Sequence, residues 1–317
     1  MKRKTCIAYH PDLLLHTTEI LHPESPDRLK TIQAKLKQSF KNSELTWLDV
    51  EPALERWIEA NHCPAYIKKI ESFSKIKSPL RIDNDTIASS STGYVSYLAA
   101  GAVIQAVDFV MSMRHSNAFC AIRPPGHHAE YDYAMGFCFL NNVAIGAHYA
   151  MNQYQLNRIA IIDFDVHHGN GTQNSFYKND KVFYLSLHEH PLYPGSGRKS
   201  EIGEQQGINK TLNIPLPPGT SVKKYRKIFT EVALPAIYNF EPELILLSAG
   251  FDAHKLDPLS SLQISTSYFG ELTKQIVDIS DKFCDGRIVS CLEGGYHVEA
   301  LSESVVSHIL ALRSRLT

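Results

Sequence analysis

Short apolar runs alternate with helical patterns along the whole chain. Six runs have the length and residue types of buried strands, namely 5–9, 118–122, 158–162, 182–187, 244–248 and 287–292. Segments between them carry apolar residues at helical spacing: 27–36, where Leu29, Ile32 and Leu36 share one face, 97–113, and 221–234 with Ser221 as its N-cap. This alternation predicts an α/β protein with a mostly parallel sheet and helices on its faces.

The chain has no internal repeat, low-complexity tract or Gly/Ser/Pro linker, so we expect one domain over residues 1–317. Segment 191–218 is rich in Gly and Pro and predicts a long surface loop. The most apolar window, 97–111, is short and carries Gln105 and Asp108. It predicts a packed helix rather than a membrane span.

Composition narrows the class of protein. Lys and Arg number 32 and Asp and Glu 33, which argues against a nucleic-acid or membrane-surface protein held by bulk charge. The six cysteines form no C-x-x-C pair and read as buried free thiols. No signal peptide is evident at the N-terminus, so we expect a cytoplasmic protein, with a secreted effector as the open alternative. The 15 histidines point to metal or acid/base chemistry.

Polar residues follow four of the predicted strands directly. The four segments are "RPPGHH" from Arg123, "DFDVHHGN" from Asp163, "AGFDAH" from Ala249 and "EGGYH" from Glu293. Parallel strands present their C-terminal ends at one edge of the sheet, which is where ligands bind in α/β folds. We therefore expect one converging site.

Two carboxylates and an imidazole in "DFDVHH" have the spacing of metal ligands. Asp163 and Asp165 fall on one face of the strand end, His167 follows on the same side, and Asp252 arrives from another strand. These residues can supply three ligands to a divalent metal and leave positions open, as in a catalytic zinc site. The alternative for this motif alone is that its acidic residues cap helices or face solvent.

The adjacent histidines His127 and His128 suit general acid/base catalysis, because the pKa of imidazole lies near working pH. Asp163 and Asn170 could orient their rings. A single loop histidine is more often a structural hydrogen-bonding residue, but a pair in a Pro-Pro-Gly frame is different.

Tyr296 follows Gly294-Gly295, whose backbone freedom could aim its hydroxyl at a developing oxyanion. Phe137 and Tyr193 could line an apolar channel. The alternative for all three aromatic residues is a place in the core.

With these residues in view, the chain resembles the zinc-dependent histone deacetylase superfamily, which also holds acetylpolyamine amidohydrolases and acetoin-utilisation proteins. The resemblance runs through "HPESPDRL", "RPPGHHAE", "GFCFLNN", "DFDVHHGNGTQ", "YLSLHEH", "LSAGFDAHKLDPL" and "CLEGGY", which together span essentially the whole chain. It is closest to class II deacetylases and their bacterial relatives. It implies a single-domain, three-layer arginase/deacetylase-like fold.

The resemblance also implies roles for individual residues. Asp165, His167 and Asp252 would bind one catalytic zinc ion. His128 would be the general base and then the acid, while His127, held by Asp163, would act electrostatically, and Tyr296 would polarise the scissile carbonyl.

Further implied residues shape the substrate tunnel and bind potassium. Gly136, Phe137 and Tyr193 would surround an acyl-lysine stem. One or two structural potassium ions are expected, the first near Asp163, Asp165, His167 and Ser186 and the second near Phe176, Asn179 and Val182.

Two departures from the class I pattern fit class II. Asn170 stands where class I enzymes have Asp, and Glu293 replaces a Gly. Tyr296 is present where vertebrate class IIa proteins carry His, so we expect an active enzyme.

The favoured activity is hydrolysis of N-acyl-lysine in a protein or peptide, releasing a short acid. The alternative is deacetylation of a free polyamine, but Leu259 is neutral at the position where polyamine-specific relatives tend to carry a Glu. Asp85 is our candidate to hold the substrate backbone N–H at the rim. A dinuclear manganese hydrolase of the arginase type would need more ligand aspartates, and a non-catalytic acyl-lysine reader would need a broken site.

Overall fold

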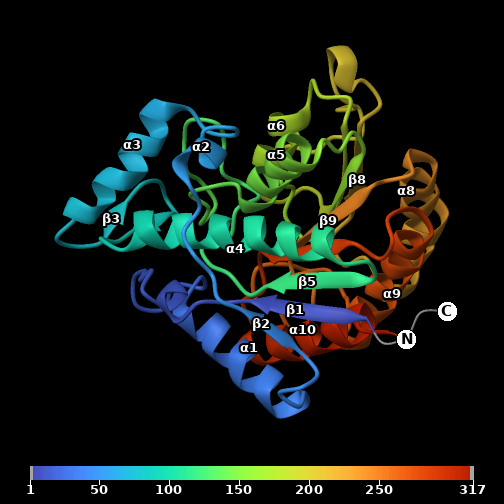
Figure 1. Ribbon diagram of the computed structural model, residues 1–317, viewed down its shortest axis with the longest axis horizontal. Helices are drawn as coiled ribbons and strands as arrows, with labels where there is room; N and C mark the ends of the chain where they lie inside the picture. The colour runs from blue at the N-terminus through green and yellow to red at the C-terminus, as the bar shows by residue number, and fades with distance from the viewer. Residues whose placement is uncertain (1–2, 315–317) are drawn as a thin grey trace.

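The chain folds around one eight-stranded sheet, seen in a computed structural model that describes residues 3–314 (Figure 1). The strand order is β2-β1-β5-β10-β9-β6-β7-β8, and every neighbouring pair is parallel. The strands are β1 (Lys4–Ala8), β2 (Thr46–Leu48), β5 (Ser116–Cys120), β6 (Ile159–Asp163), β7 (Val182–Glu189), β8 (Thr211–Leu216), β9 (Leu244–Ala249) and β10 (Ile288–Leu292). The predicted α/β fold with a mostly parallel sheet is confirmed.

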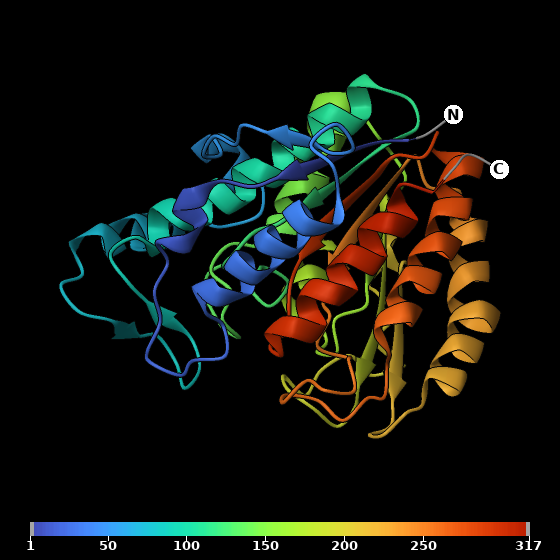
Figure 2. The same cartoon turned by 90° about the horizontal axis from the view of Figure 1, so that it is seen from below.

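Helices cover both faces of the sheet. Helices α4 and α5 pack on one face, and Figure 2 shows α1, α10 and α9 side by side on the other. The helices are α1 (Pro26–Ser39), α2 (Glu55–Ile58), α3 (Pro64–Ser72), α4 (Thr92–Ser112), α5 (Asn142–Tyr154), α6 (Asn170–Phe176), α7 (Val222–Ile228), α8 (Leu234–Phe240), α9 (Thr266–Phe283) and α10 (Val298–Leu312). Short elements are the 3-10 helices η1 (Pro11–Leu14), η2 (Phe73–Lys75) and η3 (Gln205–Gly207), the π-helix η4 (Phe229–Ala233), and the β3 (Leu80–Arg81) and β4 (Ile87–Ala88) hairpin.

Helix α4 contains the most apolar segment of the sequence, residues 97–111. By length and hydropathy it could cross a membrane, but 67% of its apolar window is buried inside the molecule. It packs against β5 and α5, and its Gln105 amide donates to the backbone oxygen of Glu51. Burial on this scale is typical of a core helix in a globular protein.

Two sequence predictions need correction. Segment 191–218 is not all loop, because it contains η3 and the edge strand β8. Asn213 and Pro215 interrupt the apolar pattern of β8, and an edge strand tolerates such a Pro. Segment 221–234 is not one regular helix but consists of α7, the π-helix η4 and the start of α8. Pro235 lies in the first turn of α8 and has no N–H to donate, so a regular α-helical hydrogen-bond pattern cannot continue through it. Ser221 does cap α7, accepting from the Lys224 N–H at 3.4 Å.

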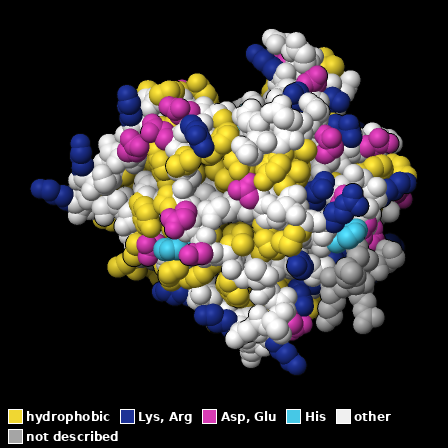
Figure 3. Space-filling model, in the orientation of Figure 1, with side chains coloured by type: hydrophobic (Ala, Val, Ile, Leu, Met, Phe, Trp, Pro, Cys, Tyr) yellow, Lys and Arg dark blue, Asp and Glu magenta, His cyan; other side chains and the backbone are white. Residues whose placement is uncertain are grey.

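The surface and the cysteines agree with an ordinary globular protein. Figure 3 shows acidic and basic side chains mixed over one face, with no large area of a single sign. All six cysteines are free; five are buried and Cys63 is half-buried.

Candidate active site

The site forms where the central strands end. Strands β5, β10, β9 and β6 are consecutive in the sheet, so the loops that follow them meet at its C-terminal edge. These loops carry His127, Tyr296, Asp252 and Asp165 respectively. The four polar strand ends singled out in the sequence therefore do converge.

Asp165, His167 and Asp252 form a buried group that could bind a metal ion. One ligand atom from each residue lies within 4.8 Å of the others. The His167 Nδ1 atom is 3.1 Å from both Asp165 Oδ1 and Asp252 Oδ2. A Cβ on Gly294 would overlap the Asp252 carboxylate, and the Gly294 N–H donates to Asp165 Oδ2 at 2.8 Å. Only a glycine leaves room for both carboxylates here.

The charges in this group favour a cation. Burial and the nearby Asp165 carboxylate raise the pKa of Asp252 to about 7. Burial disfavours a charged His167, yet its hydrogen bonds to the two carboxylates raise the pKa of this imidazole to about 10. Without a metal, the group formed by Asp165, His167 and Asp252 therefore holds a proton between its carboxylates and imidazole. A divalent ion bound by the same three residues would displace this proton.

The adjacent histidines lie in contrasting environments, with ring centroids 4.0 Å apart. His127 Nδ1 lies 3.0 Å from Asp163 Oδ2; burial opposes its charge, but Asp163 and Asp165 raise the pKa of His127 to about 10. His128 Nδ1 lies 2.8 Å from Asn170 Oδ1, and burial together with the charges of His127 and His167 lowers the pKa of His128 well below its usual value. The first ring is held charged and the second neutral, the form a general base needs.

Tyr296 lies across the site from the histidine pair. Its N–H donates to Asp257 Oδ2 at 2.7 Å, its ring packs edge-on against Phe137, and the Arg28 guanidinium lies 5.0 Å from its ring centroid. Burial raises the pKa of the Tyr296 hydroxyl well above its usual value, so it stays protonated and can donate a hydrogen bond.

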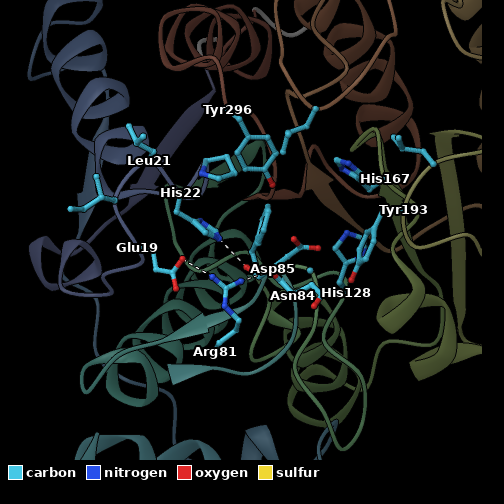
Figure 4. Close-up of a pocket in the computed structure, with 16 residues that line it drawn as sticks. Glu19, Leu21, His22, Arg81, Asn84, Asp85, His128, His167, Tyr193 and Tyr296 are labelled. Atoms are coloured by element: carbon cyan, nitrogen blue, oxygen red, sulfur yellow. Dashed lines mark hydrogen bonds and ion pairs between the residues drawn. The ribbon is translucent and has the colours of Figure 1, made fainter. Parts of the chain in front are cut away.

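A cavity of about 500 Å³ leads from the surface to these groups (Figure 4). Its wall includes His128, His167 and Tyr296 and all five predicted substrate residues, which are Gly136, Phe137, Tyr193, Asp85 and Leu259. Gly136 has a φ of +55°, and a Cβ there would lie 2.5 Å from the His128 ring. The narrow passage beside His128 therefore needs this glycine.

The mouth of the cavity has a lip that sequence reasoning missed. It consists of residues 19–22 and the β3–β4 hairpin, joined by a Glu19–Arg81 ion pair of 2.6 Å and by His22 Nε2, 2.9 Å from the Asp85 backbone oxygen. Ile20 and Leu21 on this lip are 94% and 97% exposed. Nothing in the local pattern marks them, because an exposed apolar pair is indistinguishable in sequence from a buried one.

A second layer of buried charges supports the site from behind. Arg123 makes two 2.8 Å bonds to the Glu24 carboxylate, which also pairs with Arg28, and Arg28 donates to the Gly295 backbone oxygen at 2.7 Å. The Glu293 carboxylate accepts from the N–H groups of Gly126 at 2.7 Å and His127 at 3.2 Å. Burial raises the pKa of Glu293 to about 7. Five of these residues lie in the motifs "HPESPDR" and "RPPGHH", but the sequence does not show how they pair.

The residues named for potassium lie in two places. Asp163 and Ser186 are register partners on β6 and β7, and Ser186 Oγ is 2.9 Å from His188 Nδ1. Phe176 ends α6 and accepts from the Asn179 N–H at 2.9 Å, while Val182 begins β7. The first set overlaps the candidate active site, because Asp163 bonds to His127 and because Asp165 and His167 belong to the metal-binding group. The second set lies apart, between the end of α6 and the start of β7.

A buried Asp-His-Asp group that could bind a metal, with its His167 on the wall of a cavity beside His128 and Tyr296, defines a candidate hydrolase site. Comparison with known proteins agrees. Residues 22–312 match the family model described as "Histone deacetylase domain". The chain belongs to the histone deacetylase family, and membership supports a hydrolase of the deacetylase and amidohydrolase type.

Relatives from an archaeon and a bacterium align with most of this chain. A "Probable deacetylase" of Archaeoglobus fulgidus is 40% identical over 93% of this chain and 82% of its own length. A "Histone deacetylase-like amidohydrolase" of Pseudomonas aeruginosa is 33% identical over 92% of this chain and 78% of its own. The solved structure titled "Crystal Structure of HDA15 HD domain" aligns with a TM-score of 0.93 and 31% identity, over 99% of this chain and 90% of the other.

Proposed function

We propose that this protein is a zinc-dependent hydrolase that removes acetyl or other short acyl groups from lysine side chains in proteins or peptides. The observation that carries the proposal is the buried group of Asp165, His167 and Asp252, whose His167 lines the cavity together with His128 and Tyr296. Two carboxylates and one imidazole are a ligand set that zinc accepts with positions left open.

When bound, zinc would polarise the scissile carbonyl and lower the pKa of a water molecule. The chain's own residues supply the rest. Neutral His128 takes a proton from the attacking water at Nε2 and returns it to the departing lysine amine. Charged His127 and the Tyr296 hydroxyl stabilise the negative oxygen that develops on the carbonyl. The family pattern supports potassium as a further, structural ion at the two sites named above.

The cavity wall favours a lysine stem over a polyamine. Phe137 and Tyr193 give the passage apolar sides, and Leu259 offers no charge to a second ammonium. The exposed lip residues Ile20 and Leu21 offer apolar contacts to residues that flank an acyl-lysine, which a free polyamine lacks. Asp85 remains our candidate for the substrate backbone N–H.

The test compares two substrates on zinc-loaded protein: an acetyl-lysine peptide and an N-acetylated polyamine, each followed by release of free amine. We expect faster turnover of the peptide, and Tyr296→Phe should lower kcat by about a hundredfold because it removes the oxyanion donor. Faster turnover of the polyamine would overturn our interpretation of Leu259. No turnover of either would overturn the lysine proposal and direct attention to other amides.

A further inference from the structure

The Asn170 side chain stands between His128 and a buried carboxylate, Glu130. Its Oδ1 atom lies 2.8 Å from His128 Nδ1, and its Nδ2 atom donates to Glu130 Oε1 at 2.5 Å and to the His128 backbone oxygen at 3.3 Å. His128, Asn170 and Glu130 therefore form one continuous hydrogen-bonded row.

This row fixes which ring nitrogen of His128 carries a proton. Asn170 Nδ2 has three partners, the Glu130 carboxylate, the His128 carbonyl and the Met135 thioether sulfur at 3.3 Å, and all three can only accept. The amide must therefore turn its oxygen toward His128. The oxygen can only accept in turn, which places the His128 proton on Nδ1 and leaves a lone pair on Nε2. That tautomer is the one a general base requires.

Glu130 is itself held firmly. Its side chain is buried, and the Asn174 amide donates to its two carboxylate oxygens at 2.9 and 3.0 Å. Its backbone N–H donates to the Tyr133 oxygen at 3.0 Å, and its backbone oxygen lies 2.9 Å from His62 Nδ1. A carboxylate with this many partners has one position, so it can dictate the position of the Asn170 amide.

We propose that Glu130 is a positioning residue for His128 and acts through Asn170, which lies between them. Glu130 thereby supplies, through the Asn170 amide, the negative charge that an Asp at position 170 would place directly beside His128. The inference rests on the proposed hydrolysis. His128 keeps its Nδ1 proton throughout, takes the proton of the attacking water at Nε2 and passes it to the leaving amine. No proton crosses the amide, and Glu130 takes no part in the proton transfer.

The charge of Glu130 matters because the other charged groups near His128 act in opposite directions on a positive charge on its ring. The charged His127, whose ring centroid lies 4.0 Å from that of His128, opposes a positive charge on the His128 ring, and the Asp165 carboxylate favours it. The amide dipole of Asn170, aligned by Glu130, adds to the favourable side at the moment the ring becomes imidazolium.

The sharpest test exchanges the position of the charge. Glu130→Gln keeps the shape and an acceptor oxygen but removes the charge, and should lower kcat about tenfold with little change in KM. Asn170→Asp should also lower kcat, because the new carboxylate would repel the adjacent Glu130 carboxylate. The double variant carries one carboxylate directly on His128, so its kcat should exceed that of either single variant. A Glu130→Gln enzyme with wild-type kcat, or a double variant slower than both, would overturn the inference.

A matched control is Glu189→Gln, since Glu189 is also buried and bonded to two donors, the N–H and hydroxyl of Ser261, but has no link to His128. It should leave kcat unchanged.

A second measurement does not depend on turnover. In metal-free protein, the NMR resonance of the His128 Nδ1 proton, assigned by its loss in His128→Ala, should move upfield in Glu130→Gln. An unmoved resonance contradicts the inference, whereas an inactive wild type with a moved resonance contradicts only the proposed hydrolysis.

Discussion

Glu293 shows how a single side chain holds the loop that carries the two histidines. It is fully buried, accepts from the Gly126 and His127 N–H groups, and lies 3.2 Å from Ser248 Oγ. Glu293→Ala leaves two buried N–H donors without partners, so we expect the free energy of unfolding to fall by about 3 kcal/mol in urea titrations. Glu293→Gln keeps one acceptor oxygen and should lose less. Equal losses for the two variants would show that side-chain volume, not hydrogen bonding, sets the effect.

At the same residue scale, the sequence predicts the residues that meet at the candidate site but misses several of the side chains that hold them in place. Asp165, His167 and Asp252 are recognisable because each directly follows a strand, and order along the chain then implies closeness in space. Arg28 and Glu130 act over distances that no local pattern records: Arg28 reaches the backbone of Gly295, 267 residues away in sequence. Hydrogen bonds of this kind become visible only when the elements are packed.

At the scale of elements, the lip formed by residues 19–22 and the β3–β4 hairpin should contact the substrate chain beside the acyl-lysine. Replacing both Ile20 and Leu21 by Ser removes exposed apolar surface without touching the reacting groups. We expect KM for an acetyl-lysine peptide to rise about fivefold at constant kcat, because both side chains lose apolar area that a bound peptide would cover.

Two measurements control this prediction. Free Nε-acetyl-lysine has no flanking residues to contact the lip, so its kinetics should be the same in the double variant and the wild type. Leu310→Ser removes an exposed leucine, 54% exposed near the end of α10, away from the cavity, and should leave the kinetics of both substrates unchanged. A change in kcat for free acetyl-lysine would mean that the lip shapes the site itself.

Elements, too, were predictable to different degrees. The six central strands are continuous apolar runs because parallel strands are buried on both faces. β2 has only three residues, and β8 carries Asn213 and Pro215, so neither has a run long enough to recognise. The π-helix η4 leaves the apolar spacing of segment 221–234 nearly unchanged, and only Pro235 beside it signals a break.

At the scale of the whole molecule, buried neutral histidines tie stability to pH. His308 lies between α10, α9 and β10, with Nδ1 2.6 Å from Thr273 Oγ1 and Nε2 2.9 Å from Ser290 Oγ. Burial lowers the pKa of His308 from 6.5 to about 3. Because its folded pKa is depressed, the stability it contributes is fully present above pH 6.5 and falls as the pH drops toward 3, where the unfolded chain binds a proton that the folded chain refuses.

His308→Gln isolates this contribution from that of other groups, some of which act in the opposite sense. Asp252 and Glu293 have raised pKa values of about 7, so their share of the stability grows as the pH falls below 7. Comparing wild type with His308→Gln cancels those shares. The variant should be less stable at neutral pH, but at about pH 5 its deficit should shrink by about 2 kcal/mol, since it has no imidazole to protonate on unfolding. Urea titrations at both pH values measure the difference, and a deficit that does not change with pH would mean that folding does not lower the pKa of His308.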